Sequence, residues 1–411
     1  MKQEPNFNTT SGVRAAKAEA PARRTGLISQ CLAWSDRHRI LSILAVSALA
    51  ILVNCYPIIF CGRSYVSPVR AMPMVYGGWP SLPGITGDTP QVERHGSDTG
   101  ATMWWAVPMG FVESRSILDQ GELPLWNRYS HAGDTLIGQA VSMMGDPLHL
   151  IVLAGHGSAL AWDIKFLLAK FLFCAGFGLL IRRLLGHGPL SLVYAALAAW
   201  CGAFFFINNH PAFFVFCYSP WILLSALALL EGRSMGWGAA WLLANVGCFN
   251  GGHVEVAVAV IGGLNLAALG YALVTNLKQA PRIIGRMAVA TTLFMGLTAP
   301  VWISFLSQLQ GAYSAHADPH VIQFPFRCLP AIFDDFFSTL ITRTIPFDAL
   351  IPETGLLILV GCALSAFGWK LLKDQPFFWV NSAMILCWTG SIFGWIPASF
   401  LLAIPLFNRV G

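Results

Sequence analysis

Long apolar runs separated by short polar turns dominate the chain from residue 39 onward. A helix that crosses the hydrocarbon core of a bilayer needs about 20 predominantly apolar residues. Runs of this kind predict membrane-spanning helices near 39–60, 159–181, 188–207, 211–230, 235–250, 253–274, 287–308, 353–369 and 376–395, with a last one beginning near 396. The pattern therefore predicts an all-α, polytopic membrane bundle of about ten transmembrane helices.

The composition agrees with a membrane protein, because only 11% of the 411 residues are charged while 55% are hydrophobic. A soluble globular domain carries roughly 25% charged residues. The net charge of +5 does not indicate nucleic acid as a partner, since the basic residues stand at the ends of apolar runs rather than in one patch. Membrane lipids are the surroundings that this composition predicts.

Basic residues mark alternate turns between the predicted spans. They are Arg182, Arg183, Arg233, Lys278, Arg282, Arg286, Lys370 and Lys373. Because short loops rich in lysine and arginine stay on the cytoplasmic side, this pattern places the N-terminus in the cytoplasm. Residues 1–38 are then a disordered basic tail and 39–411 the transmembrane domain, with outer loops at 61–156 and 310–350. The chain stops at 407–411 where a span is ending, which predicts a fragment or a truncated version.

The first outer loop is too long for a simple connector, since loops beyond about 15 residues are usually functional or disordered. Its pattern predicts an amphipathic helix from Thr99 to Leu118, which Gly121 ends, and a second short helix at Pro147–Leu153. Two helices lying on the membrane surface would form a shelf above the bundle.

Asp98 precedes the first of these surface helices and has two interpretations. An acidic residue at this position caps the free N–H groups of a helix. A carboxylate at the boundary between water and membrane can also serve as a general base that deprotonates an acceptor hydroxyl. The residue type alone does not choose between them.

Several segments of the chain carry a resemblance to a known family. They are Asp98, Pro124-Leu-Trp-Asn-Arg-Tyr129, Gly145-Asp-Pro-Leu-His-Leu150, His210, Tyr218-Ser-Pro-Trp221, Gly251-Gly-His-Val-Glu255 and Glu353-Thr-Gly-Leu356. In these segments the chain resembles the YfhO-like family of bacterial GT-C-type integral membrane glycosyltransferases. The first outer loop is the most specific part of the likeness.

The resemblance implies a GT-C-like architecture and transfer of a sugar from a polyprenyl-phosphate donor to a glycan, lipid or protein acceptor. The reaction would occur at the outer face of the bacterial cytoplasmic (inner) membrane, with Asp98 as the general base by its matching position. Some enzymes of this type use a divalent cation held by two acids, and others use none. The metal is therefore unassigned and no cofactor is certain.

Polar residues within or beside the spans are candidates for contact with the substrate. Lys170 lies about 12 Å below the outer end of the second span, at 1.5 Å per residue, where an ionisable group indicates function. Alternatively, Lys170 pairs with Asp163 or extends its amine to the membrane interface. Extension of the amine to the interface is also the interpretation of Lys165. His253 and Glu255 follow two glycines and either contact the donor phosphate or sugar, or form a capped, hydrated helix start.

Four residues of the outer loops complete the set of candidates. Arg327 stands beside aromatic residues and either binds phosphate or is an ordinary loop arginine. Trp126 and Asn127 are expected first to hold a turn and second to contact the sugar. Asp134 is an alternative to Asp98 as the general base. Asp98 could also form a metal site with Asp134, or with Asp334 and Asp335.

Two other functions fit a polytopic chain. One is a transporter or lipid flippase, in which Asp163, Lys170 and Glu255 line a substrate pathway; however, no duplicated, broken spans are visible. The other is a non-catalytic subunit of an envelope assembly. Among the cysteines, Cys55, Cys61 and Cys328 could face an oxidising compartment, although small apolar packing residues are the main interpretation.

Overall fold

The computed structural model describes residues 37–66, 102–129, 133–138, 142–186, 188–201, 204, 210–311, 323–324, 326, 329, 363, 365–397 and 399–400. Asp98, Arg327 and most of the predicted second outer loop lie outside these residues, as do Cys328 and nearly all of the predicted N-terminal tail.

The described part is helical over most of its length. Its main helices are α2 (Arg39–Asn54), α3 (Tyr56–Phe60), α7 (Ala159–Leu185), α8 (Gly188–Leu197), α10 (Ala212–Cys217), α11 (Ser219–Leu230), α12 (Met235–Phe249), α13 (Val254–Thr275), α14 (Ala280–Gly311), α17 (Trp369–Leu372) and α18 (Pro376–Ile392), with 3₁₀ turns η3 (Ala198–Trp200) and η4 (Leu277–Gln279). Four segments are long and apolar enough to cross a membrane, namely Ala159–Leu185, Ala212–Leu230, Val254–Thr275 and Leu277–Ser307. An all-α membrane protein is thus confirmed, whereas the number of spans near ten and the GT-C architecture stay predictions.

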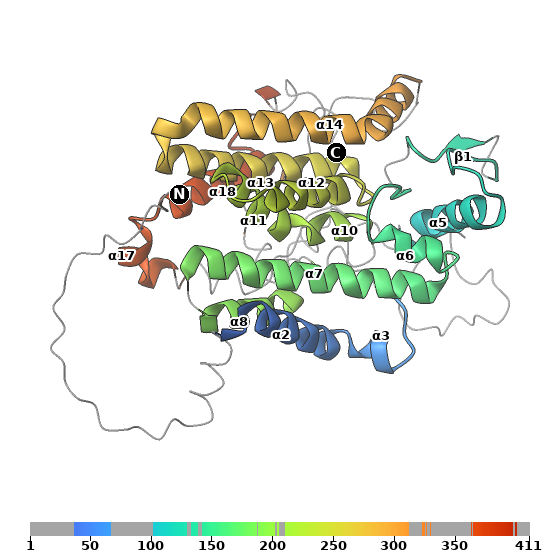
Figure 1. The fold of residues 1–411 in the computed structure, drawn as a ribbon, viewed down its shortest axis with the longest axis horizontal. Helices are drawn as coiled ribbons and strands as arrows, with labels where there is room; N and C mark the ends of the chain where they lie inside the picture. Colours follow the sequence, from blue (N-terminus) through green and yellow to red (C-terminus); the bar gives the residue numbers. More distant parts are fainter. Residues whose placement is uncertain are drawn as a thin grey trace, which may run out of the picture.

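The helices lie side by side along one common direction (Figure 1). Helix α7 contacts α2, α8 and α11, and α11 in turn contacts α12 and α13. Helix α18 packs on α13, and α14 packs on α12 and α13. Because α7 is apolar around most of its circumference, it can be covered by neighbours on several sides.

Charged residues gather at one end of this bundle. Gly186 ends α7 in the left-handed region, with φ of 68°, after Arg182 and Arg183 in the last turn, where cations are favoured. Arg183 pairs with Glu231 at 2.7 Å, and the Arg286 guanidinium donates to the carbonyl of Leu230 at 2.7 Å. We call this the basic end; its cytoplasmic location stays a prediction.

The described parts of the predicted first outer loop lie at the opposite end, which we call the loop end (Figure 1). There a π-helical turn η1 (Thr102–Ala106), α5 (Val107–Ser114) and a second π-helical turn η2 (Arg115–Asp119) form one continuous helix, and α6 (His149–Ala154) follows later. Gly121, with φ of 66°, comes directly after the first helix. Both predicted loop helices are therefore confirmed within the described residues.

Glycine allows a close helix approach within the bundle. A Cβ atom on Gly178 of α7 would lie 2.7 Å from the Cβ of Ala195 and 2.8 Å from Cγ2 of Ile43. Helices α8 and α2 therefore contact the backbone of α7 directly at this level. Small residues at such crossings are characteristic of helix packing in membranes.

We expect Gly178→Ala to destabilise the bundle by about 1–3 kcal/mol, since overpacking a tight contact forces backbone shifts. The matched control is Gly285→Ala in α14, where an added Cβ meets no atom within 4 Å. Thermal unfolding in detergent measures both, and equal midpoints for the two variants would contradict the packing argument.

Candidate functional site

A buried ion pair joins α7 to the loop before α6. Nζ of Lys165 lies 2.8 Å from Oδ2 of Asp146, and both side chains are 0% exposed. The other carboxylate oxygen accepts from the hydroxyl of Tyr218 at 2.5 Å and from the backbone N–H of Leu148 at 3.1 Å. Charge burial is tolerated only when the charge is paired and hydrogen-bonded, and these three donors provide both conditions.

The position of Tyr218 depends on a glycine in the neighbouring helix. A Cβ on Gly247 of α12 would lie 2.5 Å from Cζ of Tyr218. The absence of that atom leaves room for the phenol ring beside α12 while its hydroxyl reaches Asp146. Lys165 of α7 and Tyr218, between α10 and α11, thus converge on one carboxylate.

The polar chain continues from Lys165 to α5. Nδ1 of His149 lies 3.1 Å from Nζ of Lys165, and Nε2 lies 2.8 Å from Oε2 of Glu113. An ammonium group can only donate, so Nδ1 accepts and Nε2–H donates to the carboxyl group. The amine also lies 4.3 Å from the ring centroid of Phe214, within the range of a cation–π interaction.

Burial shifts the ionisation of the two loop residues in opposite directions. It raises the pKa of Glu113 well above its ordinary value, and the cation of Lys165 offsets this only in part. It lowers the pKa of His149 well below its ordinary value, and the same cation adds to the effect. At neutral pH the histidine is therefore uncharged, and the raised pKa of Glu113 shifts this carboxyl toward its protonated form.

The interpretation of Lys165 as an interface residue is wrong. Its amine is buried because Asp146 lies in the chain segment that folds over the start of α7. The position of Lys165 along its predicted span gave no signal of this pairing, since its partner Asp146 lies 19 residues earlier, in a loop. The motif Gly145-Asp-Pro-Leu-His-Leu150 contained the signal, because an acid and a histidine three residues apart can face the same side of a short helix.

The second lysine of α7 does not pair with Asp163, so that alternative is wrong. Nζ of Lys170 donates to Oδ1 of Asn54 at 2.5 Å, and Asp163 accepts from the hydroxyl of Ser64 at 3.0 Å and the N–H of Tyr65 at 2.8 Å. Each contact ties α7 to the end of α2 or to the chain that follows α3. Both residues therefore serve contacts between segments.

His253 and Glu255 stand at the start of α13, at the loop end. Nδ1 of His253 accepts from the N–H of Val256 at 3.4 Å, so the histidine caps the helix, and it lies 3.7 Å from a Glu255 carboxylate oxygen. The ring of His210 lies beside that of His253 in a tilted arrangement, with centroids 4.9 Å apart. Burial lowers the pKa of His210 to about 4, so this ring is neutral at physiological pH. The interpretation as a capped helix start is confirmed, and Glu255 remains 37% exposed.

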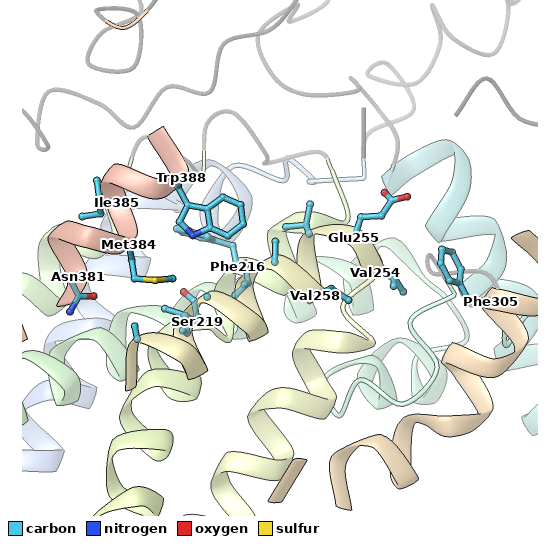
Figure 2. A pocket seen from close by; sticks show the side chains of 16 residues that line it. Phe216, Ser219, Val254, Glu255, Val258, Phe305, Asn381, Met384, Ile385 and Trp388 are labelled. Carbon is cyan, nitrogen blue, oxygen red and sulfur yellow. The ribbon is translucent and has the colours of Figure 1, made fainter. Parts of the chain in front are cut away.

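An apolar groove of about 530 Å³ extends from Glu255 along α13. Figure 2 shows Glu255 and Phe305 on one side of this space and Asn381 and Met384 of α18 on the other. Its wall on α13 runs from Glu255 to Ala267, which are 12 residues apart and so span about 18 Å of helix. The lining is almost entirely apolar between the carboxylate and the amide.

The remaining candidates of the first outer loop form a small hairpin. Strand β1 (Trp126–Asn127) pairs antiparallel with β2 (Asp134–Thr135). The side chain of Asn127 accepts from the N–H of Tyr129 at 3.0 Å, and the indole of Trp126 covers Gly133. Trp126 and Asn127 thus hold the turn, as expected. The nearby Arg128 pairs with Glu122.

Within the described ranges no group of three His, Cys, Asp or Glu side chains could hold a metal ion. Cys55 forms no disulfide there, and its thiol lies 3.2 Å from the Tyr65 hydroxyl.

Comparison with known proteins adds no relative. No family model matches the chain, and neither a curated protein nor a solved structure gives a significant match.

We expect Glu113→Gln to remove a pH dependence of stability. A raised pKa means that the folded protein keeps this proton to higher pH than the unfolded chain. Stability from Glu113 is thus full below the ordinary glutamate pKa and falls as pH rises through the raised value. Relative to the wild type, the variant should therefore gain in thermal midpoint as pH increases above the ordinary glutamate pKa. His149 changes stability in the opposite sense, because its lowered pKa destabilises the fold as pH falls.

Glu122→Gln is the matched control for this measurement, since Glu122 is exposed and pairs with Arg128. If the thermal midpoint of Glu113→Gln depends on pH as that of the wild type does, another group is responsible for the dependence.

Proposed function

We propose that this protein is a membrane glycosyltransferase of the GT-C type that uses a polyprenyl-phosphate sugar as donor. The groove along α13 is the observation that carries the proposal. It is apolar over about 18 Å of helix and has a carboxylate at the loop end, so it suits a hydrocarbon chain whose polar end stays near the surface. Burial of such a chain contributes roughly 25 cal/mol per Å² of apolar area.

The roles of the residues at the groove follow from their charge. Glu255 repels a phosphate, so we assign it to sugar or acceptor hydroxyl groups, which it binds as a hydrogen-bond acceptor. His253 adjoins it at the same helix start. Lys170 contacts Asn54 of α2 and does not line the groove, so its assignment to the donor phosphate loses support.

In the proposed reaction Asp98 takes the proton of the acceptor hydroxyl. The oxygen then forms a bond to the anomeric carbon of the sugar, and the bond from that carbon to the polyprenyl phosphate breaks with inversion. The phosphate leaves with the electron pair. The acceptor is a glycan, lipid or protein, and the reaction takes place on the outer face of a bacterial cytoplasmic membrane.

Asp98→Asn should lower the rate of sugar transfer by about 10²–10⁴-fold, since a general base contributes that factor. The amide keeps the ability to cap a helix. Asp88→Asn, a change of the same kind in the same loop, should leave the rate within about twofold of the wild type, well below the effect of a general base. Transfer from a radiolabelled polyprenyl-phosphate sugar in proteoliposomes measures both. Full activity of Asp98→Asn would exclude this residue as the base.

Filling the groove should block the donor. Gly263 lines the groove, and its added Cβ would lie 3.5 Å from Trp388, whereas a Cβ on the adjacent Gly262 meets nothing within 4 Å. We expect Gly263→Phe to raise the donor KM at least about tenfold, which corresponds to 1.4 kcal/mol of lost binding, and Gly262→Phe to leave it unchanged. Equal KM values for the two variants would place the donor elsewhere.

The same groove would suit a lipid flippase, the alternative function. That activity is measured as movement of a fluorescent lipid-linked sugar across the proteoliposome membrane. Movement that Gly263→Phe blocks, in the absence of any sugar transfer, would replace the glycosyltransferase proposal.

A further inference from the structure

The loop of residues 142–148, which we call the bridging loop, connects the buried ion pair with the start of the groove. Its Asp146 is held by Lys165, Tyr218 and the N–H of Leu148. Its Met143 lies in the left-handed region, with φ of 57°, and its sulfur is 3.0 Å from Nζ of Lys165. A non-glycine residue in that region costs roughly 1–2 kcal/mol, so the surrounding contacts must hold it there.

The other side of the bridging loop touches the turn that leads into α13. A Cβ on Gly145 would lie 3.0 Å from Cγ of Asn250, and a Cβ on Gly252 would lie 2.6 Å from Cε of Met143. Gly145 and Gly252 both have positive φ, of 96° and 100°. At two points, therefore, a glycine backbone in one segment lies directly against a side chain of the other.

This turn immediately precedes His253 and Glu255. A continuous set of contacts thus runs from Lys165 through Met143 to Gly252, and from Asp146 through its neighbour Gly145 to Asn250. Displacement of the loop would move the turn and the first residues of α13 with it.

We propose that Lys165 and Asp146 are positioning residues, which fix the bridging loop and thereby set the placement of His253 and Glu255 at the end of the groove. This inference rests on the proposed function only in taking that end as the place where the polar part of the substrate binds.

Hydrogen exchange of the turn tests the proposal without any substrate. In Lys165→Met we expect the amides of 250–256 to exchange at least about tenfold faster than in the wild type, because their supporting loop is released. The amides of 265–275 in the second half of α13 should stay unchanged. The matched control is Lys170→Met, which removes the other buried lysine of α7 and its hydrogen bond to Asn54, a residue far from the turn in sequence. Exchange at 250–256 should not change in that variant.

A double variant separates positioning from stability. Lys165→Met combined with Asp146→Leu removes both buried charges, and such replacements often restore stability. The thermal midpoint should recover toward the wild type, while the exchange at 250–256 stays fast. If Lys165→Met alone does not fold, this double variant carries the measurement. Slow exchange at 250–256 in the double variant, or equally fast exchange throughout α13, would overturn the proposal.

The kinetic result is a separate readout. If the sugar-transfer assay works, the double variant should raise the donor KM more than it lowers kcat, since the groove itself is intact and only its polar end is displaced. A failure of sugar transfer in the wild type would count against the proposed function and leave the exchange result standing.

Discussion

The ion pair between Lys165 and Asp146 is the constraint on which the loop end of the molecule depends. An ammonium group that is wholly removed from water is stable only beside a fixed counter-charge, so Asp146 has to lie at this place. The requirement fixes a loop that contains one left-handed methionine and one left-handed glycine. The arrangement of α5 and α6 over the start of α7 then follows, because Glu113 and His149 extend the same hydrogen-bonded chain.

Helix α13 illustrates how one helix can be fixed on one face and leave the other available. Asn265 accepts from the indole of Trp241 at 2.7 Å and donates to Asn245 at 2.9 Å, which holds α13 against α12. Gly263, two residues earlier, points to the opposite face and lines the groove. Interhelical amides of this kind are worth about 0.6 kcal/mol each in membranes. The groove can thus stay open because α13 is secured from its other side.

The sequence predicted the parts of the molecule that depend on local pattern. Helices α7, α12 and α13, the pair α10 and α11, and the two loop helices agree closely with their apolar runs, and His253 caps α13 as its position before the run suggested. The partners of Lys165 and Lys170 were not predictable in this way. Each lies in a segment far away in sequence, and the periodicity of a single helix carries no information about which loop covers it. The groove was missed for the same reason, since residues of several helices far apart in sequence, α13 and α18 among them, line it.

The two buried lysines explain why α7 is the central element. They are five residues apart, which places them about 140° apart around the helix axis. Lys165 therefore faces the bridging loop, where it pairs with Asp146, and Lys170 faces α2, where it donates to Asn54. An apolar residue at either position would remove a directional contact that helps to set the rotation and depth of α7, and apolar packing would not replace it, because lipid chains and aliphatic side chains are equally apolar. Two directional contacts on different faces leave a single rotation and depth for α7. The loop end, and with it the polar end of the groove, takes its position from that helix.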